Sequence, residues 1–380
     1  MPSPAGSGGS TLLLSSPRML HPDGKLAPGW VRVEGGSIAA TGSGLPPEPA
    51  DVEAPVLSPG FVDIHCHGGG GHSFVTPDPA EASAAAGVHH RLGTTTVLAS
   101  LVTAAIPDLL AQIGTLRGLV ETGVLGGIHL EGPWLSKAFH GAHDPQLLTD
   151  PAAPVVERLL AAGGGTIRMV TLAPERTGAL EAIGQLSAAG VTAAVGHTDA
   201  DGGLAASAFD AGATVVTHLF NAMRPIHHRD PGPIATALAD PRVAVEIIAD
   251  GVHLHDDVLL LAARAATGGY LLITDAMAAA AAPDGTYQLG GVEVSVRNGV
   301  ARTVATGAIA GSTLTMPQAV RRLVAAGEDP ARALTAATRK PADAVGLASV
   351  GRLVPGCSAD LVLLDEELAV QQVLRQGAFL

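Results

Sequence analysis

The sequence predicts an α/β protein, a (β/α)8 TIM-type barrel, with a small β-sandwich domain built from both chain termini. Short, almost continuously apolar strands alternate with amphipathic, Ala-rich helices from residue 57 onward. This alternation indicates a parallel sheet covered on both faces. About eight such units follow one another, and a closed barrel of this kind typically takes roughly 250 residues. The segments near the two ends read instead as short strands joined by Gly-containing turns.

The barrel elements are recognised by β-favouring apolar runs and by helical periodicity between them. Several helices are expected to end just before a glycine, for example Gly190 and Gly212. An open doubly wound sheet is the competing fold, and it is disfavoured because no Gly-rich phosphate loop opens a helix in the first unit. The expected strands are 61–67, 94–101, 125–130, 166–172, 191–196, 213–218, 243–248 and 270–274, and the expected helices are 79–91, 107–120, 154–162, 178–189, 203–211 and 256–266.

Both ends of the chain are expected to belong to one small β-domain, because termini often lie near one another in a domain. This gives a β-domain over 1–57 plus 350–380 and a barrel over 58–349. The Asn298-Gly299 pair predicts a hairpin in an insertion near 285–305. Residues 1–10 read as a loose tail rather than a signal peptide. The expected terminal strands are 11–14, 30–33, 37–40, 359–364 and 368–373.

The amino-acid composition disfavours several kinds of binding partner. The net charge of −13 argues against nucleic acid and against anionic membranes, and the aromatic content of 3% disfavours base stacking. No apolar stretch approaches the roughly 18 residues of a membrane span. Cys66 and Cys357 do not make a disulfide framework, so we expect a cytoplasmic protein. A small anionic substrate stays possible, since a few local cations can bind it.

The first barrel strand carries the pair His65 and His67. Residues two apart on a strand point to the same side, so both imidazoles face one way and Cys66 faces the other. Two imidazoles at the end of a strand, beside four consecutive glycines (68–71), make a plausible metal site. The alternative is a pair of surface histidines.

Other expected strands also end in histidines and carboxylates, and residues at the carboxyl ends of barrel strands do the chemistry. Buried charged groups are costly unless paired or metal-bound, so packing alone explains this pattern poorly. We therefore predict a shared metal-dependent active site. The side chains concerned are His65, His67, Glu131, His197, His218, Asp250, His253 and Asp275.

Neighbouring polar residues have less specific explanations. His129 is expected in the core behind Glu131, and His89 and His90 are expected to pack on a helix or face solvent. Asp199 fits a helix N-cap as well as a catalytic group, and Asp63 is a candidate to orient His65.

These motifs resemble the amidohydrolase superfamily, and within it the branch that deacetylates phosphorylated amino sugars. The resemblance covers essentially the whole chain. Strand 166–172 has no lysine at its end, where many two-metal relatives carry a bridging carboxylated lysine, and Glu131 is the obvious replacement. The matching segments are 59–68, 130–134, 141–143, 195–198, 217–223, 249–253, 274–277, 311–316 and 355–361.

The resemblance implies a divalent ion, Zn²⁺ or Fe²⁺, held by Glu131, His197 and His218. It also implies that His65 and His67, with Glu131 as a bridge, are able to hold a second one. It implies that Asp275 is the general base and acid and that His143 hydrogen-bonds the carbonyl oxygen of the acetamide. The implied reaction converts N-acetylglucosamine 6-phosphate to glucosamine 6-phosphate and acetate.

The resemblance further implies that Asn221, Ala222, His253 and Arg229 bind the substrate. Arg229 would hold the phosphate across the interface of a homodimer, although Arg224 and His228 in the same loop offer similar chemistry. Other amidohydrolase reactions, on a cyclic amide or another N-acetylated sugar, and a catalytically inactive sugar-phosphate-binding barrel are the alternatives.

Overall fold

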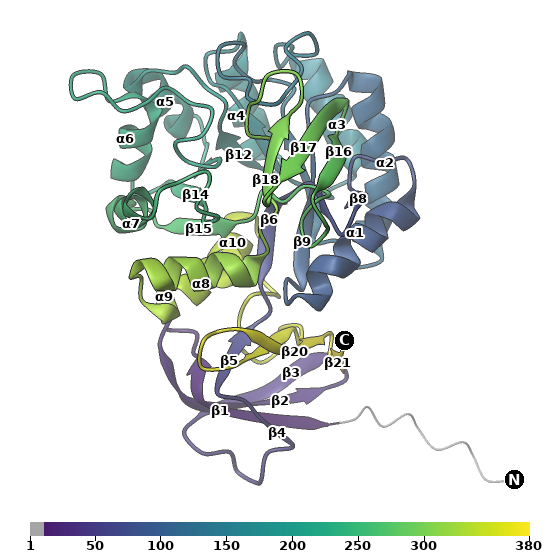
Figure 1. The fold of residues 1–380 in the computed structure, drawn as a ribbon, viewed down its shortest axis with the longest axis vertical. Coiled ribbons are helices and arrows are strands. Elements are labelled where there is room, and N and C mark those ends of the chain that lie inside the picture. Colours follow the sequence, from purple (N-terminus) through teal and green to yellow (C-terminus); the bar gives the residue numbers. More distant parts are fainter. Residues whose placement is uncertain (1–10) are drawn as a thin grey trace, which may run out of the picture.

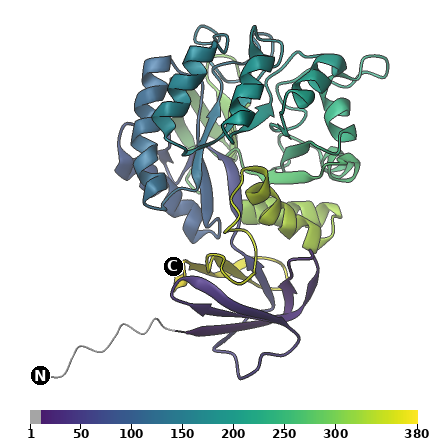
Figure 2. The ribbon, with the colours of Figure 1, turned by 180° about the vertical axis from the view of Figure 1, so that it is seen from behind.

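A computed structural model describes residues 11–380, so the expected tail over 1–10 lies outside the described residues. Two sheets dominate the molecule (Figure 1): a parallel barrel sheet surrounded by helices, and a separate sheet that contains strands from both ends of the chain. The helices that cover the barrel are also seen from behind in Figure 2. The fold class expected from the sequence is confirmed.

The eight barrel strands pair in parallel and in chain order. The gap between the last strand and the first is bridged by a bond in which the Asp275 N–H donates to the His65 carbonyl at 2.9 Å. Every expected strand is present, although the one expected at 213–218 is reduced to two residues. The strands are β6 (Val62–Cys66), β9 (Thr96–Leu101), β10 (Gly127–Glu131), β11 (Ile167–Leu172), β12 (Thr192–Val195), β13 (Val215–Val216), β14 (Ala244–Ile248) and β15 (Tyr270–Ile273).

Six expected helices are confirmed, and residues 11–380 contain four more. Gly190 and Gly212 follow α4 and α5 with φ of 71° and 119°, values that favour glycine after a helix. The expected helices are α1 (Pro79–Arg91), α2 (Ile106–Glu121), α3 (Ala153–Gly163), α4 (Ala179–Ala188), α5 (Gly202–Asp210) and α7 (Asp256–Ala265). The additional ones are α6 (Gly232–Ala239), α8 (Met316–Ala326), α9 (Pro330–Ala336) and α10 (Arg339–Ala344).

The terminal strands form one continuous sheet that packs on its own apolar cluster, which includes Leu14, Val31 and Leu361. Strand β5 joins strands from the two ends of the chain, since it pairs with β1 on one side and with β19 on the other. The strands are β1 (Leu12–Leu20), β2 (Leu26–Glu34), β3 (Ser37–Ser43), β4 (Val52–Glu53), β5 (Val56–Pro59), β19 (Leu361–Leu364), β20 (Val370–Arg375) and β21 (Ala378–Phe379).

The insertion after β15 is a three-stranded antiparallel sheet of β16 (Gly285–Leu289), β17 (Val292–Arg297) and β18 (Val300–Thr303). Its predicted hairpin is present, with Asn298 and Gly299 at φ of 52° and 72°, as a type I′ turn requires. A small ribbon of β7 (Gly68–Gly69) and β8 (His72–Ser73) follows β6. In Figure 1 the insertion lies in front of the barrel.

Candidate active site

The ends of five barrel strands bring one cluster of imidazoles and carboxylates together. Glu131 is the last residue of β10, while His197, His218 and Asp275 follow β12, β13 and β15 by two residues. These last three residues have positive φ, at 46°, 29° and 51°. Non-glycine residues rarely adopt this backbone conformation, and such strain is typical of functional positions.

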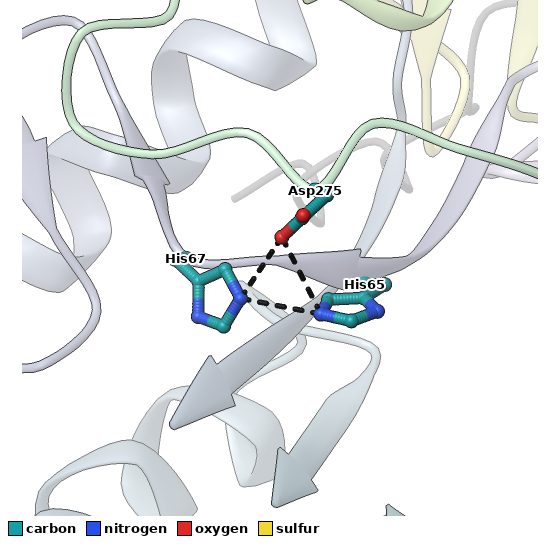
Figure 3. Close-up of side chains that lie close together, drawn as sticks. All are labelled: His65, His67 and Asp275. Carbon is teal, nitrogen blue, oxygen red and sulfur yellow. Dashed lines mark hydrogen bonds and ion pairs between the residues drawn. The ribbon is translucent and has the colours of Figure 1, made fainter. Parts of the chain in front are cut away.

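Two groups of three side chains could each hold a metal ion, and the donor atoms within each group lie within 4.8 Å of one another. The first group is His65, His67 and Asp275 (Figure 3), in which Asp275 Oδ1 lies 3.2 Å from His67 Nε2 and 3.5 Å from His65 Nε2. In the second group, Glu131 Oε1 lies 3.1 Å from His197 Nε2 and 3.0 Å from His218 Nε2. The same carboxylate reaches His67 at 3.3 Å, so Glu131 lies between the two groups.

The imidazoles are oriented so that their Nε2 atoms converge. His67 Nδ1 faces the Ser100 carbonyl at 3.1 Å, and His65 Nδ1 faces the Glu246 carboxylate at 3.1 Å. These acceptors place the hydrogen of each neutral ring on Nδ1, which leaves a lone pair on Nε2. The two Nε2 atoms then face each other at 3.2 Å, an arrangement that favours a cation between them.

In the second group, His197 is oriented in the same way, whereas His218 Nδ1 has no partner among the described residues. His197 Nδ1 faces the Phe139 carbonyl at 2.9 Å, and the Nε2 atoms of His197 and His218 lie 3.1 Å apart. Two imidazoles and one carboxylate that leave room for water are a common donor set for catalytic divalent ions. The residues present therefore fit a divalent metal at each group.

Electrostatics favour positive charge at this cluster. Glu131 is 4% exposed. Burial alone would raise its pKa, but His65 and His143 hold the pKa of Glu131 well below its usual value. Burial lowers the pKa of His67, but its contacts with Asp275 and Glu131 outweigh this and raise that pKa to about 9. Carboxylates that favour a proton on these imidazoles also favour a divalent cation in its place.

A cavity of about 350 Å³ opens onto this cluster and contains most of the expected substrate-binding residues. Its walls include His143, Asn221, Ala222 and His253, together with Leu289 from the insertion. His253 is oriented by Asp250, whose Oδ2 lies 2.7 Å from Nδ1. Arg229 does not line the cavity; it lies in an exposed loop, where Nη1 donates to His228 Nε2 at 2.8 Å.

Several neighbours of the site also take the expected places. His129 is buried and bonds Ser100 and Thr171 rather than either ligand group. Cys66 points away from the cluster, with Sγ 3.3 Å from His89 Nε2, which places His89 in the core.

The prediction for Asp199 was wrong. Asp199 is neither an N-cap nor part of the cavity: Asp201 caps α5, and Asp199 accepts a bond from Arg224 Nε at 2.9 Å. Asp63, the candidate to orient His65, does contact this residue, but at its backbone: the Asp63 carboxylate accepts bonds from the His65 N–H and from Thr274. The ring is held by Glu246, which the expected set lacked; a single charge in an otherwise apolar buried strand was the available signal.

A barrel with two such groups at its strand ends defines a class of metal-dependent hydrolases. The chain belongs to the amidohydrolase family, whose model matches residues 56–379, and this family is metal-dependent.

Within this family, the chain is similar in sequence to deacetylases of amino-sugar 6-phosphates. The chain is 38% identical to an N-acetylgalactosamine-6-phosphate deacetylase of Escherichia coli O157:H7, over 97% of this chain and 98% of that protein. It is 36% identical to an N-acetylglucosamine-6-phosphate deacetylase of Homo sapiens, over 87% and 84% of the two chains.

Among solved structures, it is similar to an N-acetyl-D-glucosamine-6-phosphate deacetylase from Mycobacterium smegmatis, with a TM-score of 0.94 and 47% identity over 98% of this chain and 99% of that chain. That structure is of a mutant in complex with N-acetyl-D-glucosamine-6-phosphate.

Proposed function

We propose that this chain hydrolyses the acetamide of N-acetylglucosamine 6-phosphate to give glucosamine 6-phosphate and acetate, a step of amino-sugar metabolism in catabolism or cell-wall recycling. The observation that carries the proposal is the cavity in which Glu131, His143, His197, His218 and Asp275 meet. The relative from Mycobacterium smegmatis, whose structure holds this substrate, supports the choice of substrate.

Asp275 is the proposed general base and acid. Burial would raise its pKa, but His65 and His67 lower that pKa to about 2, so the carboxylate is ionised at neutral pH. Oδ1 faces the two imidazoles, which leaves the second oxygen to accept a proton from the attacking water. The same group then delivers the proton to the leaving amine, as one carboxylate can do in both halves of a hydrolysis.

His143 is the proposed donor to the carbonyl oxygen. Burial lowers its pKa to about 4, so the ring is neutral at pH 7. The Thr103 backbone N–H donates to its Nδ1 at 3.3 Å, so Nδ1 has the lone pair and Nε2 has the hydrogen. His143 lines the cavity, and its Nε2 lies 3.3 Å from Glu131 Oε2. From this position Nε2–H is the proposed donor that stabilises the negative charge of the tetrahedral state.

Replacing His143 with Gln should lower kcat by roughly 10²–10³-fold, the typical loss of one donor to a developing oxyanion. KM should change little, because the bond strengthens only as charge develops. Steady-state kinetics of acetate release measure both. His140→Gln is the matched control, since His140 is not among the cavity walls. A His143→Gln variant with unchanged kcat would contradict this role.

Glu131, His197 and His218 are proposed to hold one divalent ion, Zn²⁺ or Fe²⁺, and His65, His67 and Asp275 a second. A divalent cation here supplies Lewis acidity, which lowers the pKa of water and polarises an amide carbonyl. Chelation should abolish turnover and lower the melting temperature, because a ligand that binds only the folded state stabilises it. Restoring Zn²⁺ and Fe²⁺ separately, with melting temperature and activity as readouts, checks this. Full activity in the chelated protein would contradict it.

Arg229 is the proposed phosphate ligand, contributed across a homodimer interface. None of the described residues that line the cavity is Lys or Arg, so a guanidinium for the phosphate would come from outside these residues. Arginine suits phosphate because its guanidinium presents a fork of N–H donors.

Arg229→Gln should lower kcat/KM for the phosphorylated substrate by roughly 10–100-fold, since a bond to a charged group contributes about 1.5–3 kcal/mol. Activity on unphosphorylated N-acetylglucosamine should not change. Arg264→Gln, at an exposed position of α7, is the control. Mixing Arg229→Gln with Asp275→Asn protomers should restore activity, because one site of the mixed dimer is intact. Loss in Arg224→Gln but not in Arg229→Gln would transfer the role to Arg224.

A second substrate has a specific observation in its favour, the N-acetylgalactosamine-6-phosphate deacetylase relative. The deciding experiment compares kcat/KM on both 6-phosphates and on unphosphorylated N-acetylglucosamine. Preference for N-acetylglucosamine 6-phosphate supports the proposal. Preference for the galactosamine epimer overturns the choice of sugar, and equal rates with and without phosphate overturn the phosphate site.

The cytoplasm is the proposed compartment. No helix in residues 11–380 has the length and apolar character of a membrane span. Cys66 and Cys357 are both free and buried, which suits a reducing environment.

A further inference from the structure

Glu246 is a buried carboxylate for which the proposed reaction has no direct use. It lies on β14 with 0% of its surface exposed. Its Oε2 lies 3.1 Å from His65 Nδ1 and accepts the His218 backbone N–H at 3.2 Å. Its Oε1 has no partner among the described residues. An ionised group this deep in the protein is costly unless other charges compensate it.

The contact with His65 differs from those of the other imidazoles. His67 and His197 turn Nδ1 to neutral backbone carbonyls, whereas His65 turns it to a charge. A carboxylate in this position fixes the tautomer and direction of the ring and makes Nε2 a stronger donor to a metal. One oxygen also contacts both ligand groups, through the His65 ring and the His218 backbone.

Charge balance shows which ion this carboxylate serves. Glu131 and Asp275 together carry two negative charges at the cluster, which one divalent cation neutralises. Glu246 is a third buried negative charge beside it. A divalent ion at His65, His67 and Asp275 would be bound through the imidazole that Glu246 contacts, so it is the ion best placed to compensate this third charge.

We propose that Glu246 is a positioning residue that makes the His65, His67 and Asp275 group bind a second divalent cation. Its carboxylate aligns His65 and supplies the negative charge that the second ion requires. The inference rests on the metal site of the proposed function, but it concerns metal occupancy and not the choice of substrate.

The experiment titrates the full-length chain with Zn²⁺ alone at buffered free concentrations and measures zinc per chain. Wild type should bind two ions. Glu246→Gln keeps the shape of the side chain and removes its charge. This variant should keep the ion at Glu131, His197 and His218. It should bind the ion at His65, His67 and Asp275 roughly 10–100-fold more weakly, as expected for loss of such a partner. The matched control is Asp63→Asn, since that buried carboxylate contacts the His65 backbone and not its ring, and it should keep both affinities.

The melting temperature of Glu246→Gln, measured alongside zinc binding, distinguishes a role in metal binding from a role in stability alone. A lower melting temperature with unchanged affinity for the second ion overturns the proposal, and so does a wild type that binds only one ion. If Glu246→Gln fails to fold, Glu246→Asp keeps the charge but withdraws it from Nδ1, and it should weaken the second ion by a smaller factor. An unchanged affinity in Glu246→Asp also overturns the proposal.

Deacetylase assays are run separately. A wild type that binds two ions but leaves the phosphosugar intact refutes the proposed function and leaves the role of Glu246 standing.

Discussion

Replacing Asp275 with Asn is expected to abolish measurable deacetylation, with a loss at the upper end of the roughly 10²–10⁴-fold range of general acid–base catalysis. Asn matches the shape of Asp but cannot accept the proton of the attacking water or return it to the amine. Burial raises the pKa of Asp275, but His65 and His67 outweigh this and lower it to about 2. In the wild type the carboxylate is therefore ionised, the form that accepts a proton, across the neutral pH range.

Metal content decides how that loss is interpreted. Asp275 Oδ1 lies 3.2 Å from His67 Nε2, so the variant should also bind an ion at the His65, His67 and Asp275 group more weakly. It should keep the ion at Glu131, His197 and His218. Acetate release and zinc per chain are measured on the same preparation, with Asp257→Asn on the exposed surface of α7 as the control. Substantial turnover in a folded Asp275→Asn variant would remove the proposed base.

The barrel could be predicted because its signals are local. Each expected strand is a largely apolar run of five to eight residues, and helix and strand periods differ enough to separate them. The ligand residues could be predicted for a related reason: in a parallel barrel all carboxyl ends meet at one end, so residues such as Glu131 and His218 converge although they lie far apart in sequence.

Some of the missed features depend on contacts that sequence periodicity does not report. Helix α6 begins at Gly232 after an irregular loop, and its short apolar run has no clear polar face. Glu246 looked like part of an apolar strand, and only the position of β14 relative to β6 shows that it faces His65. Asp63, two residues before His65, was the nearer candidate in sequence, but its side chain binds the backbone and Thr274.

Glu131 is the residue whose replacement should affect the site most broadly. Its carboxylate contacts five imidazoles at 3.0–3.5 Å, so Glu131→Gln removes the negative charge that all of them share. A carbonyl oxygen is a weaker metal donor than a carboxylate, and the amide N–H₂ would be directed at ring nitrogens whose lone pairs should bind the ion. The loss of metal affinity should exceed the roughly 10–100-fold that an indirect partner contributes.

Turnover of Glu131→Gln should therefore fall below detection at ordinary metal concentrations, and zinc per chain should fall at both groups. The control is Glu175→Gln, because Glu175 bonds Thr198 and the Asp199 N–H outside the cavity. Excess Zn²⁺ separates the two contributions of Glu131. If high metal restores occupancy and also full activity, the carboxylate serves only to bind the ion. If occupancy returns while kcat stays low, the carboxylate also keeps the His143 ring, 3.3 Å away, in its working position. Normal zinc content and normal turnover at low metal would contradict the assignment of Glu131 to the metal site.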